Sequence, residues 1–427
     1  MPLNDDRRQP ERAKDAEQKA LAKVNALVMS DLVSMTTTYP SMDMTALLEH
    51  KLKTYPTLRK VFRDAALKSL ESAPSDSQTP SSPADVREEY RIPPDAKVIR
   101  PLKKAVLQDS PMETPYVNDK IEEKDLSTVL EQLNESIASS EIIWQLGSTA
   151  VLGLTSQLVL KTGHGIDIDH ISTTDYIKQQ APRLPIPEIH GILQTADGNR
   201  TFTLMSRVAG KPLDACWPSL DTEAKASVRE QLDVIFTDLR AIRPPPSPHD
   251  PRGVLLFGGG NLESRRCKDV RRQVRIADGP IANEAEFNAF ITQSPARTES
   301  SYIALARSYL TADHKVVMTH GDLHPRNIMV DFEYGPVGSD SGSEAEADSE
   351  TGSATVTSRT QRPNVVVTGV IDWEMCGWYP GYWEYVKALN TISVGCGFED
   401  WVAYLPGCIG VWPREHAVDL MLSRWHG

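Results

Sequence analysis

The pattern of apolar and polar positions changes near residue 141. Before it, the segments Ala20–Leu27 and Leu58–Leu67 place apolar side chains every three or four positions, which is the spacing of amphipathic helices. After it come short apolar runs bounded by glycine and turn residues, which are typical of strands. We therefore expect a helical N-terminal extension in residues 1–71 and a β-rich region from residue 139.

Residues 72–138 connect these two parts. They begin with Ser72–Pro83, a run of serine and proline that breaks every periodicity. Such a composition cannot bury enough apolar surface to become ordered. We interpret 72–138 as a Ser/Pro-rich linker and irregular segment, so that residues 1–138 together form an appendage.

The β-rich region, residues 139–208, is expected to be a small lobe with one helix. Its first two strands are joined by a loop with a glycine at each end, Gly147 and Gly153. The strands are predicted at Ile142–Leu146, Gln157–Lys161, Ile189–Gln194 and Thr201–Met205, and the helix at Thr174–Gln180.

The remaining residues, 209–427, are predicted to form a larger, mainly helical lobe. Its clearest helix is Ala224–Ile242, and short strands are expected at Val316–Thr319, Asn327–Phe332 and Val365–Ile371. An acidic insertion, residues 336–363, separates the last two strands. It is expected to be disordered, either as an inert loop or as a regulatory segment open to phosphorylation. The fold class is thus α+β, with two lobes.

Composition narrows the partners. The 427-residue chain has a net charge of −12, which argues against a nucleic-acid binder. Its best basic cluster, Arg265–Arg272, is interpreted as a solvated face. The five cysteines are scattered and predict reduced thiols without a zinc site, and no apolar run is long enough for a membrane span. We expect a cytoplasmic protein; its oligomeric state stays open.

Two polar motifs stand at predicted strand ends: His320-Gly-Asp-Leu-His-Pro-Arg-Asn327 and Ile371-Asp-Trp-Glu374. Phosphoryl transfer needs a cation on the phosphates, a carboxylate facing the acceptor hydroxyl, and hard oxygen ligands for Mg²⁺. Lys161, Asp322, Asn327 and Asp372 supply these in the chain order of the kinase plan. Each alone has a simpler explanation: a surface lysine, a turn cap or a helix N-cap.

These motifs resemble those of the aminoglycoside phosphotransferase and choline kinase family, and within it a fungal subgroup of mostly undefined substrate. The resemblance covers about residues 141–403. It rests on four segments: Thr319–Ile328, Gly369–Leu389, Leu184–Ile189 and Phe202–Leu213.

The resemblance implies a protein-kinase-like fold with ATP bound in the cleft between the lobes. It implies Asp322 as the catalytic residue and Mg²⁺ held by Asn327 and Asp372. The nucleotide would contact Lys161, Gly147 and Gly153, with adenine against the backbone from Met205 to Val208. His320 would support the catalytic loop structurally.

The acceptor is predicted to be a small molecule. His324 stands where protein kinases carry a lysine, and no Ala-Pro-Glu segment follows Asp372, so a protein acceptor is the less favoured alternative. Its identity stays open. Two sets of side chains are either acceptor contacts or ordinary structure: the aromatic residues Trp373, Trp378, Tyr379 and Trp383, and the acidic residues Glu374, Glu384 and Asp400.

The helix before Leu184 departs from the family pattern. Family members usually carry a glutamate there that pairs with the lysine, but ungapped counting places Thr173 at that position. A small shift would make Asp175 the partner, with Asp169 a more distant choice. Without such a partner phosphate positioning weakens. A pseudokinase that binds nucleotide or a partner without turnover is therefore the alternative function.

Overall fold

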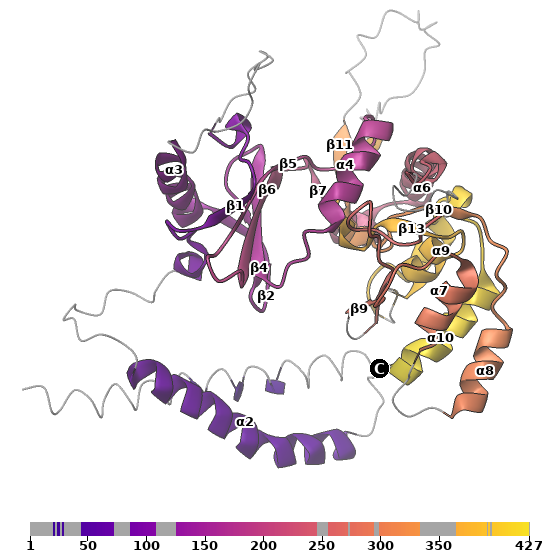
Figure 1. The fold of residues 1–427 in the computed structure, drawn as a ribbon, viewed down its shortest axis with the longest axis horizontal. Helices are drawn as coiled ribbons and strands as arrows, with labels where there is room; N and C mark the ends of the chain where they lie inside the picture. Colours follow the sequence, from indigo (N-terminus) through magenta and orange to yellow (C-terminus); the bar gives the residue numbers. More distant parts are fainter. Residues whose placement is uncertain are drawn as a thin grey trace, which may run out of the picture. The chain divides into compact units, whose positions relative to one another are not determined.

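The computed structural model of the chain divides into two units, which are described separately (Figure 1). The structure describes residues 20–21, 24–25, 28–29, 44–71, 86–107, 125–245, 255–271, 274–293, 299–333, 364–390, 392 and 395–426. The first unit, residues 1–84 with 393–396, holds helix α2 (Thr45–Glu71), which includes the predicted helix Leu58–Leu67. The second unit, residues 85–392 and 397–427, carries the predicted site. The acidic insertion 336–363 lies outside the described residues.

A six-stranded antiparallel sheet opens the second unit (Figure 1). Its strand order is β1-β5-β6-β4-β3-β2. The strands are β1 (Lys97–Arg100), β2 (Glu141–Leu146), β3 (Thr149–Gly153), β4 (Leu158–His164), β5 (Ile189–Gln194) and β6 (Arg200–Ser206). Helix α4 (His170–Gln180) lies between β4 and β5 in sequence. The predicted strands and helix of this lobe are thus present, with β3 in addition.

Two described segments before residue 139, residues 86–107 and 125–138, belong to this lobe. Helix α3 (Leu126–Ser139) buries Val129, Leu133 and Ile137 in one apolar cluster with Leu160 and Phe202 of the sheet. Strand β1 pairs with β5, and the short helices η1 (Val86–Tyr90) and η2 (Lys104–Leu107) flank β1 in sequence. The structure differs here from the expected linker 72–138, because residues 86–107 and 125–138 contribute to the core. The linker prediction rested on the serine and proline run, and the apolar stripe of α3 was not recognised from the sequence.

The helical lobe begins after β6. Helix α6 (Thr222–Ala241) is capped by Asp221, whose carboxylate accepts from the amide of Ala224 at 2.9 Å, and it buries Val228 and Phe236. The predicted helix Ala224–Ile242 is confirmed. Other elements are β7 (Lys211–Pro212), α5 (Leu213–Cys216), η4 (Trp217–Ser219), β8 (Lys268–Val270), β9 (Val274–Ile276), α7 (Glu284–Ile291), α8 (Ser300–Ser308), α9 (Trp383–Leu389), η7 (Glu399–Tyr404), η8 (Gly407–Ile409) and α10 (Pro413–His426).

Short strands inside this lobe carry the two motifs. Strand β10 (Val316–Thr319) pairs with β13 (Gly377–Pro380), and β11 (Ile328–Glu333) lies between β12 (Asn364–Val370) and β7. The predicted strands around both motifs are therefore confirmed. None of the helices in the described part of the chain is long and apolar enough to cross a membrane.

The aromatic residues that follow the second motif are core residues. Trp373, Trp378, Tyr379 and Trp383 are all buried. Trp383 meets Phe287 of α7 edge to face at 4.9 Å, and the indole of Trp378 donates to the carbonyl of Ile242 at 3.1 Å. The structural alternative for these residues is thus the one that the structure supports.

Candidate active site

The first motif forms a tight loop between β10 and β11, ending in the short helix η5 (Pro325–Asn327). Gly321 has φ of 82°, and a Cβ there would come within 2.7 Å of the carbonyl oxygen of Met375. Only glycine fits both demands. The side-chain amide of Asn327 donates to the carboxylate of Asp322 at 2.8 Å and to its carbonyl at 3.0 Å. The loop therefore holds the two residues side by side.

Buried Glu384 holds this loop by its backbone amides. Its carboxylate accepts from the backbone amides of His320 at 2.6 Å and Gly321 at 3.2 Å. Burial raises the pKa of Glu384 to about 7, although the two amides and Arg240 favour the charged form. The acceptor-binding alternative for Glu384 is wrong, because the side chain is fully buried. Its role as a loop anchor was missed, since a glutamate in a short helix looks like a surface charge in the sequence.

The second motif starts at the end of β12 and meets the first. The amide of Ile371 donates to the carbonyl of Asn327 at 2.8 Å, and Nε2 of His320 donates to the carbonyl of Ile371 at 3.0 Å. Burial lowers the pKa of His320, so the ring is neutral while Nδ1 accepts from the amide of Asp322. His320 therefore ties the two loops together.

Asp372 has φ of 66°, the one left-handed non-glycine residue in the described part of the chain. An aspartate tolerates this conformation at some energetic cost, and such strain gathers at functional sites. The short helix η6 (Trp373–Met375) follows it directly. Asp372 thus lies at a sharp turn just after β12, and its carboxylate pairs with Lys161.

Lys161 of β4 is held by two carboxylates of the second motif. Its Nζ lies 3.0 Å from Oδ1 of Asp372 and 2.5 Å from Oε1 of Glu374. Burial alone would lower the pKa of Lys161, but the two carboxylates outweigh it and raise the pKa. Burial also raises the pKa of Glu374, whereas Lys161 outweighs burial at Asp372 and lowers the pKa there.

Helix α4 supplies neither described ion-pair partner of Lys161. Thr173 is buried, and its hydroxyl donates to the carbonyl of Gly260 at 2.8 Å. Asp175 pairs with Arg100 at 2.7 Å, and Asp169 precedes the helix. Glu374 thus takes the place that the sequence left to an acid on the helix. Its other predicted alternatives, acceptor contact or surface charge, do not describe it.

A second lysine, Lys268 of β8, links the residues just before α4 to the second motif. It is buried and donates to the carboxylate of Asp167 and, at 3.0 Å, to the carbonyl of Glu374. Burial lowers the pKa of the neighbouring His170 to about 4. The interpretation of Arg265–Arg272 as a solvated face is wrong, because Arg265, Lys268 and Arg271 are buried. Their apolar neighbours are distant in sequence and gave no signal.

The predicted glycine loop is mostly strand. Gly147, with φ of 57°, lies in the hairpin turn between β2 and β3, whereas Gly153 lies in β3 opposite Val159. A Cβ on Gly153 would meet the guanidinium of Arg207 at 2.7 Å. The two glycines therefore have different roles. Gly147 lies in a hairpin turn, and Gly153 lies in a strand close to the side chain of Arg207.

The predicted adenine segment leads out of the sheet. Met205 lies in β6 opposite Val159, and Val208 packs so closely on Gly369 of β12 that a Cβ there would meet Cγ1 of Val208 at 2.5 Å. This contact joins the β-rich lobe to the strand that ends near Asp372.

Oxygen donors suitable for Mg²⁺ occur where the two motifs meet. Because Nδ2 of Asn327 donates to Asp322, its Oδ1 is the atom left for a cation. Mg²⁺ usually takes one or two protein ligands plus phosphate and water. No group of three His, Cys, Asp or Glu side chains that could hold a metal occurs among the residues described. The donor set fits Mg²⁺ bound together with a phosphate.

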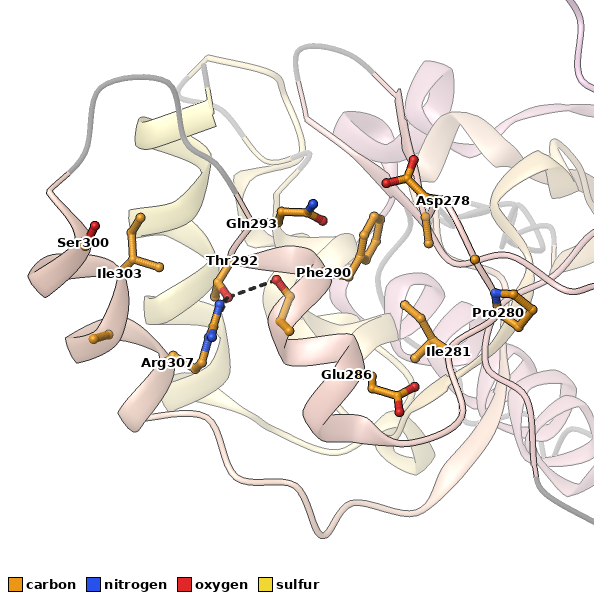
Figure 2. Close-up of a pocket in the computed structure, with 14 residues that line it drawn as sticks. Asp278, Pro280, Ile281, Glu286, Phe290, Thr292, Gln293, Ser300, Ile303 and Arg307 are labelled. Carbon is orange, nitrogen blue, oxygen red and sulfur yellow. Dashed lines mark hydrogen bonds between the residues drawn. The ribbon is translucent and has the colours of Figure 1, made fainter.

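Two cavities are notable. One of about 390 Å³ includes Asp322 and Arg326 of the first motif in its lining. The other, of about 800 Å³, lies between α7, α8 and residues 277–281 and is lined by residues such as Asp278, Phe290 and Arg307 (Figure 2). The larger cavity contains none of the predicted site residues, so the smaller one is the candidate acceptor site.

Residues 171–338 match the family model described as "Phosphotransferase enzyme family". The match includes the first motif and stops before Asp372.

Several solved structures are similar in fold. The GDP complex of aminoglycoside 2'-phosphotransferase-IIIa is 15% identical, over 67% of this chain and 83% of that one, with a TM-score of 0.38. A thermostable mutant of aminoglycoside phosphotransferase APH(4)-Ia is 15% identical, over 68% and 88%, with a TM-score of 0.41. The streptomycin–ATP complex of APH(2")-IIa is 12% identical, over 69% and 86%, with a TM-score of 0.38. A comparison with curated proteins found no significant match.

Proposed function

We propose that the chain is an ATP- and Mg²⁺-dependent phosphotransferase that moves the γ-phosphate to a hydroxyl, or an amine, of a small metabolite. The observation that carries the proposal is the meeting of two motifs and one strand lysine: Asp322 with Asn327 at 2.8 Å, and Lys161 with Asp372 at 3.0 Å. The family match supports phosphate transfer. Five free cysteines fit the reducing cytoplasm.

Each residue has a separate task in this proposal. Lys161 binds the α- and β-phosphates, and Asp322 orients the acceptor hydroxyl and accepts its proton. Mg²⁺, when bound by Asn327 and Asp372, neutralises charge on the transferring phosphate. The turn at Gly147 covers the phosphates and the backbone from Met205 to Val208 contacts adenine.

Glu374 keeps Lys161 in place when the metal occupies Asp372. The lysine has two carboxylate partners, and its 2.5 Å contact with Glu374 does not involve Asp372. Loss of Asp372 to the metal therefore leaves Lys161 paired. This arrangement replaces the helix carboxylate that the family usually places on α4.

A small-molecule acceptor is favoured over a protein. His324, where protein kinases carry a lysine, is buried, and its Nδ1 accepts from the amide of Arg326 at 2.9 Å. Burial lowers its pKa to about 4, so the ring carries no charge for the phosphate. The side chain serves the loop rather than the reaction.

The proposal is tested by turnover. Wild type, Asp322→Asn and the control Asp331→Asn, an exposed aspartate in β11, are incubated with Mg-ATP and a fractionated metabolite extract. We expect new phosphorylated masses with wild type and the control, reduced about 10²–10⁴-fold by Asp322→Asn. Equal product with all three proteins would refute the assignment of Asp322.

The second candidate function is a nucleotide-binding module without turnover. It is favoured by one observation, that α4 gives Lys161 no described ion pair and leaves it on Glu374 and on Asp372, which is also a proposed metal ligand. Mg-ATP should raise the melting temperature under either candidate, by an amount set by ligand concentration over the dissociation constant. Stabilisation with no acceptor phosphorylated in any fraction would favour the module.

A further inference from the structure

The 390 Å³ cavity beside Asp322 has walls from five parts of the helical lobe, one of which is Met375 of η6. Asp322 and Arg326 come from the catalytic loop, and Arg271 follows β8. Lys387 and Asn390 come from α9 and its end, and Ser423 from α10. A hydroxyl group of a compound bound here would lie next to the carboxylate of Asp322.

The carboxylates near this cavity lie behind its cationic lining. Arg271 donates to Asp269 at 2.8 Å and to Asp419 at 2.6 Å, and Lys387 donates to Asp269 at 2.6 Å. The side chain of Asp269 is fully buried, and that of Asp419 is 4% exposed. Neither is in the lining. In each ion pair the cationic residue lines the cavity and its acidic partner does not.

Arg326 adds a positive charge that is open to solvent. Its side chain is 55% exposed, and its guanidinium lies 3.5 Å from the carboxylate of Asp322. The charged side chains in the lining are therefore three cations and Asp322 alone as an anion. A ligand cation would meet these positive groups first, at short range, and be repelled.

The acidic residues that might have bound a cationic acceptor are engaged elsewhere. Glu384 accepts from the catalytic-loop amides, Glu374 pairs with Lys161, and Asp400 pairs with Lys225 at 2.7 Å. None of the three lines the cavity.

We infer that the acceptor is a small alcohol carrying an anionic group, such as a hydroxy acid, and not a polycationic amino sugar. This inference rests on the proposed phosphotransferase function. In the reaction the bond between the γ-phosphorus and the bridging oxygen of ATP breaks, and a bond forms between that phosphorus and the acceptor oxygen. ADP leaves with the bridging oxygen, and the acceptor proton passes to Asp322 and then to solvent.

The anionic group binds at Arg326, with Arg271 and Lys387 behind it. The hydroxyls meet Asp322, Asn390 and Ser423. Arg326 is the residue to vary, because the buried ion pairs of Arg271 and Lys387 also support folding.

Calorimetric titration with two matched sets of compounds tests the inference. One set is glycerate, glycerol and 3-amino-1,2-propanediol, and the other is glucuronate, glucose and glucosamine. Each is titrated into the full chain with and without Mg-ADP. We expect the anionic member of at least one set to bind tenfold or more tightly than its amino counterpart. Arg326→Gln should reduce that ratio below threefold, and the control Arg229→Gln, on the exposed face of α6, should not.

Equal binding, a preference for the amino compounds, or no binding by any of the six would overturn the inference. So would an unchanged preference in Arg326→Gln. Titration of Mg-ADP alone is read separately. A protein that binds Mg-ADP and fails with the acids refutes only the inference, whereas failure to bind Mg-ADP refutes the proposed function.

Discussion

The two sides of the candidate site are built differently. On one side the catalytic loop and the loop of Asp372 are joined by backbone hydrogen bonds, by neutral His320 and by buried Glu384. On the other side Lys161 depends on two side-chain ion pairs, and both partners come from the second motif. The first side is fixed by the fold, whereas the second depends on charges that a metal would redistribute.

This difference shows which contacts of the site depend on particular residues. Backbone contacts such as the amide of Gly321 on Glu384 leave few substitutions possible. A lysine needs only a carboxylate within reach, and Glu374 supplies one here. Thr173 of α4 instead donates its hydroxyl to the carbonyl of Gly260. The helix is held instead by Gly260 and, through Asp167, by Lys268.

Among the variants that compare the two sides, the largest effect is expected from Asp372→Asn, which removes a charge from both sides at once. Turnover should fall by about 10²–10³-fold, the usual loss when a preorganised group facing the transferring charge is removed. Initial rates at saturating Mg-ATP measure this, with Asp331→Asn as the matched control. A loss below tenfold would mean that the metal does not depend on Asp372.

Buried Glu384 offers a test of the first side that needs no substrate. Its pKa is raised from 4.5 to about 7, so the folded state holds this proton more tightly than the unfolded chain. The protonated side chain contributes stability that is complete below pH 4.5 and is lost as pH rises through 7. Relative to Glu384→Gln, wild type should lose about 2 kcal/mol between roughly pH 5.5 and pH 8.5.

Urea unfolding of both proteins at the two pH values measures that change. The glutamine keeps an acceptor oxygen for the amides of His320 and Gly321, so the loop should remain in place. A difference that is the same at both pH values would show that Glu384 is not the buried group described.

The second side is tested by Glu374→Gln. The glutamine would remove the negative charge 2.5 Å from Lys161 while Asp372 remains, so we expect about a tenfold loss in kcat/KM, which is typical for one charged hydrogen bond. The loss should appear mainly in the apparent affinity for ATP. No change in any kinetic constant would exclude Glu374 as the substitute for the helix acid.

The smallest effect is expected from Asp175→Asn. Its carboxylate is bound to Arg100 on a partly exposed surface, where such pairs contribute less than about 1 kcal/mol. Activity should stay within about twofold of wild type. A loss as large as that of Glu374→Gln would return the role of lysine partner to α4.

Sequence reasoning worked best where local pattern and chemistry coincide. The strands around both motifs, and Asp322 beside Asn327, follow from apolar runs that end in polar residues. These features are encoded in contiguous residues, so each can be recognised without knowing its neighbours in space.

The features that were missed depend on distant partners. Glu384 and Lys268 look like surface charges until residues 64 and 106 positions away are seen to meet them. Strand β1 is too short to be recognised alone, and it is defined by pairing with β5. Helix α3 follows residues 108–124, which lie outside the described structure, and its apolar stripe was hidden by the serine and proline run before it.

The most direct test of the central claim is the thermal stability of the full chain with ATP, with and without Mg²⁺, in wild type and Asp372→Asn. If Lys161, Asn327 and Asp372 form one metal and nucleotide site, wild type should melt higher with Mg-ATP than with ATP and EDTA, and the variant should lose most of that difference. No stabilisation of wild type, or the same Mg²⁺-dependent shift in Asp372→Asn, would contradict the account.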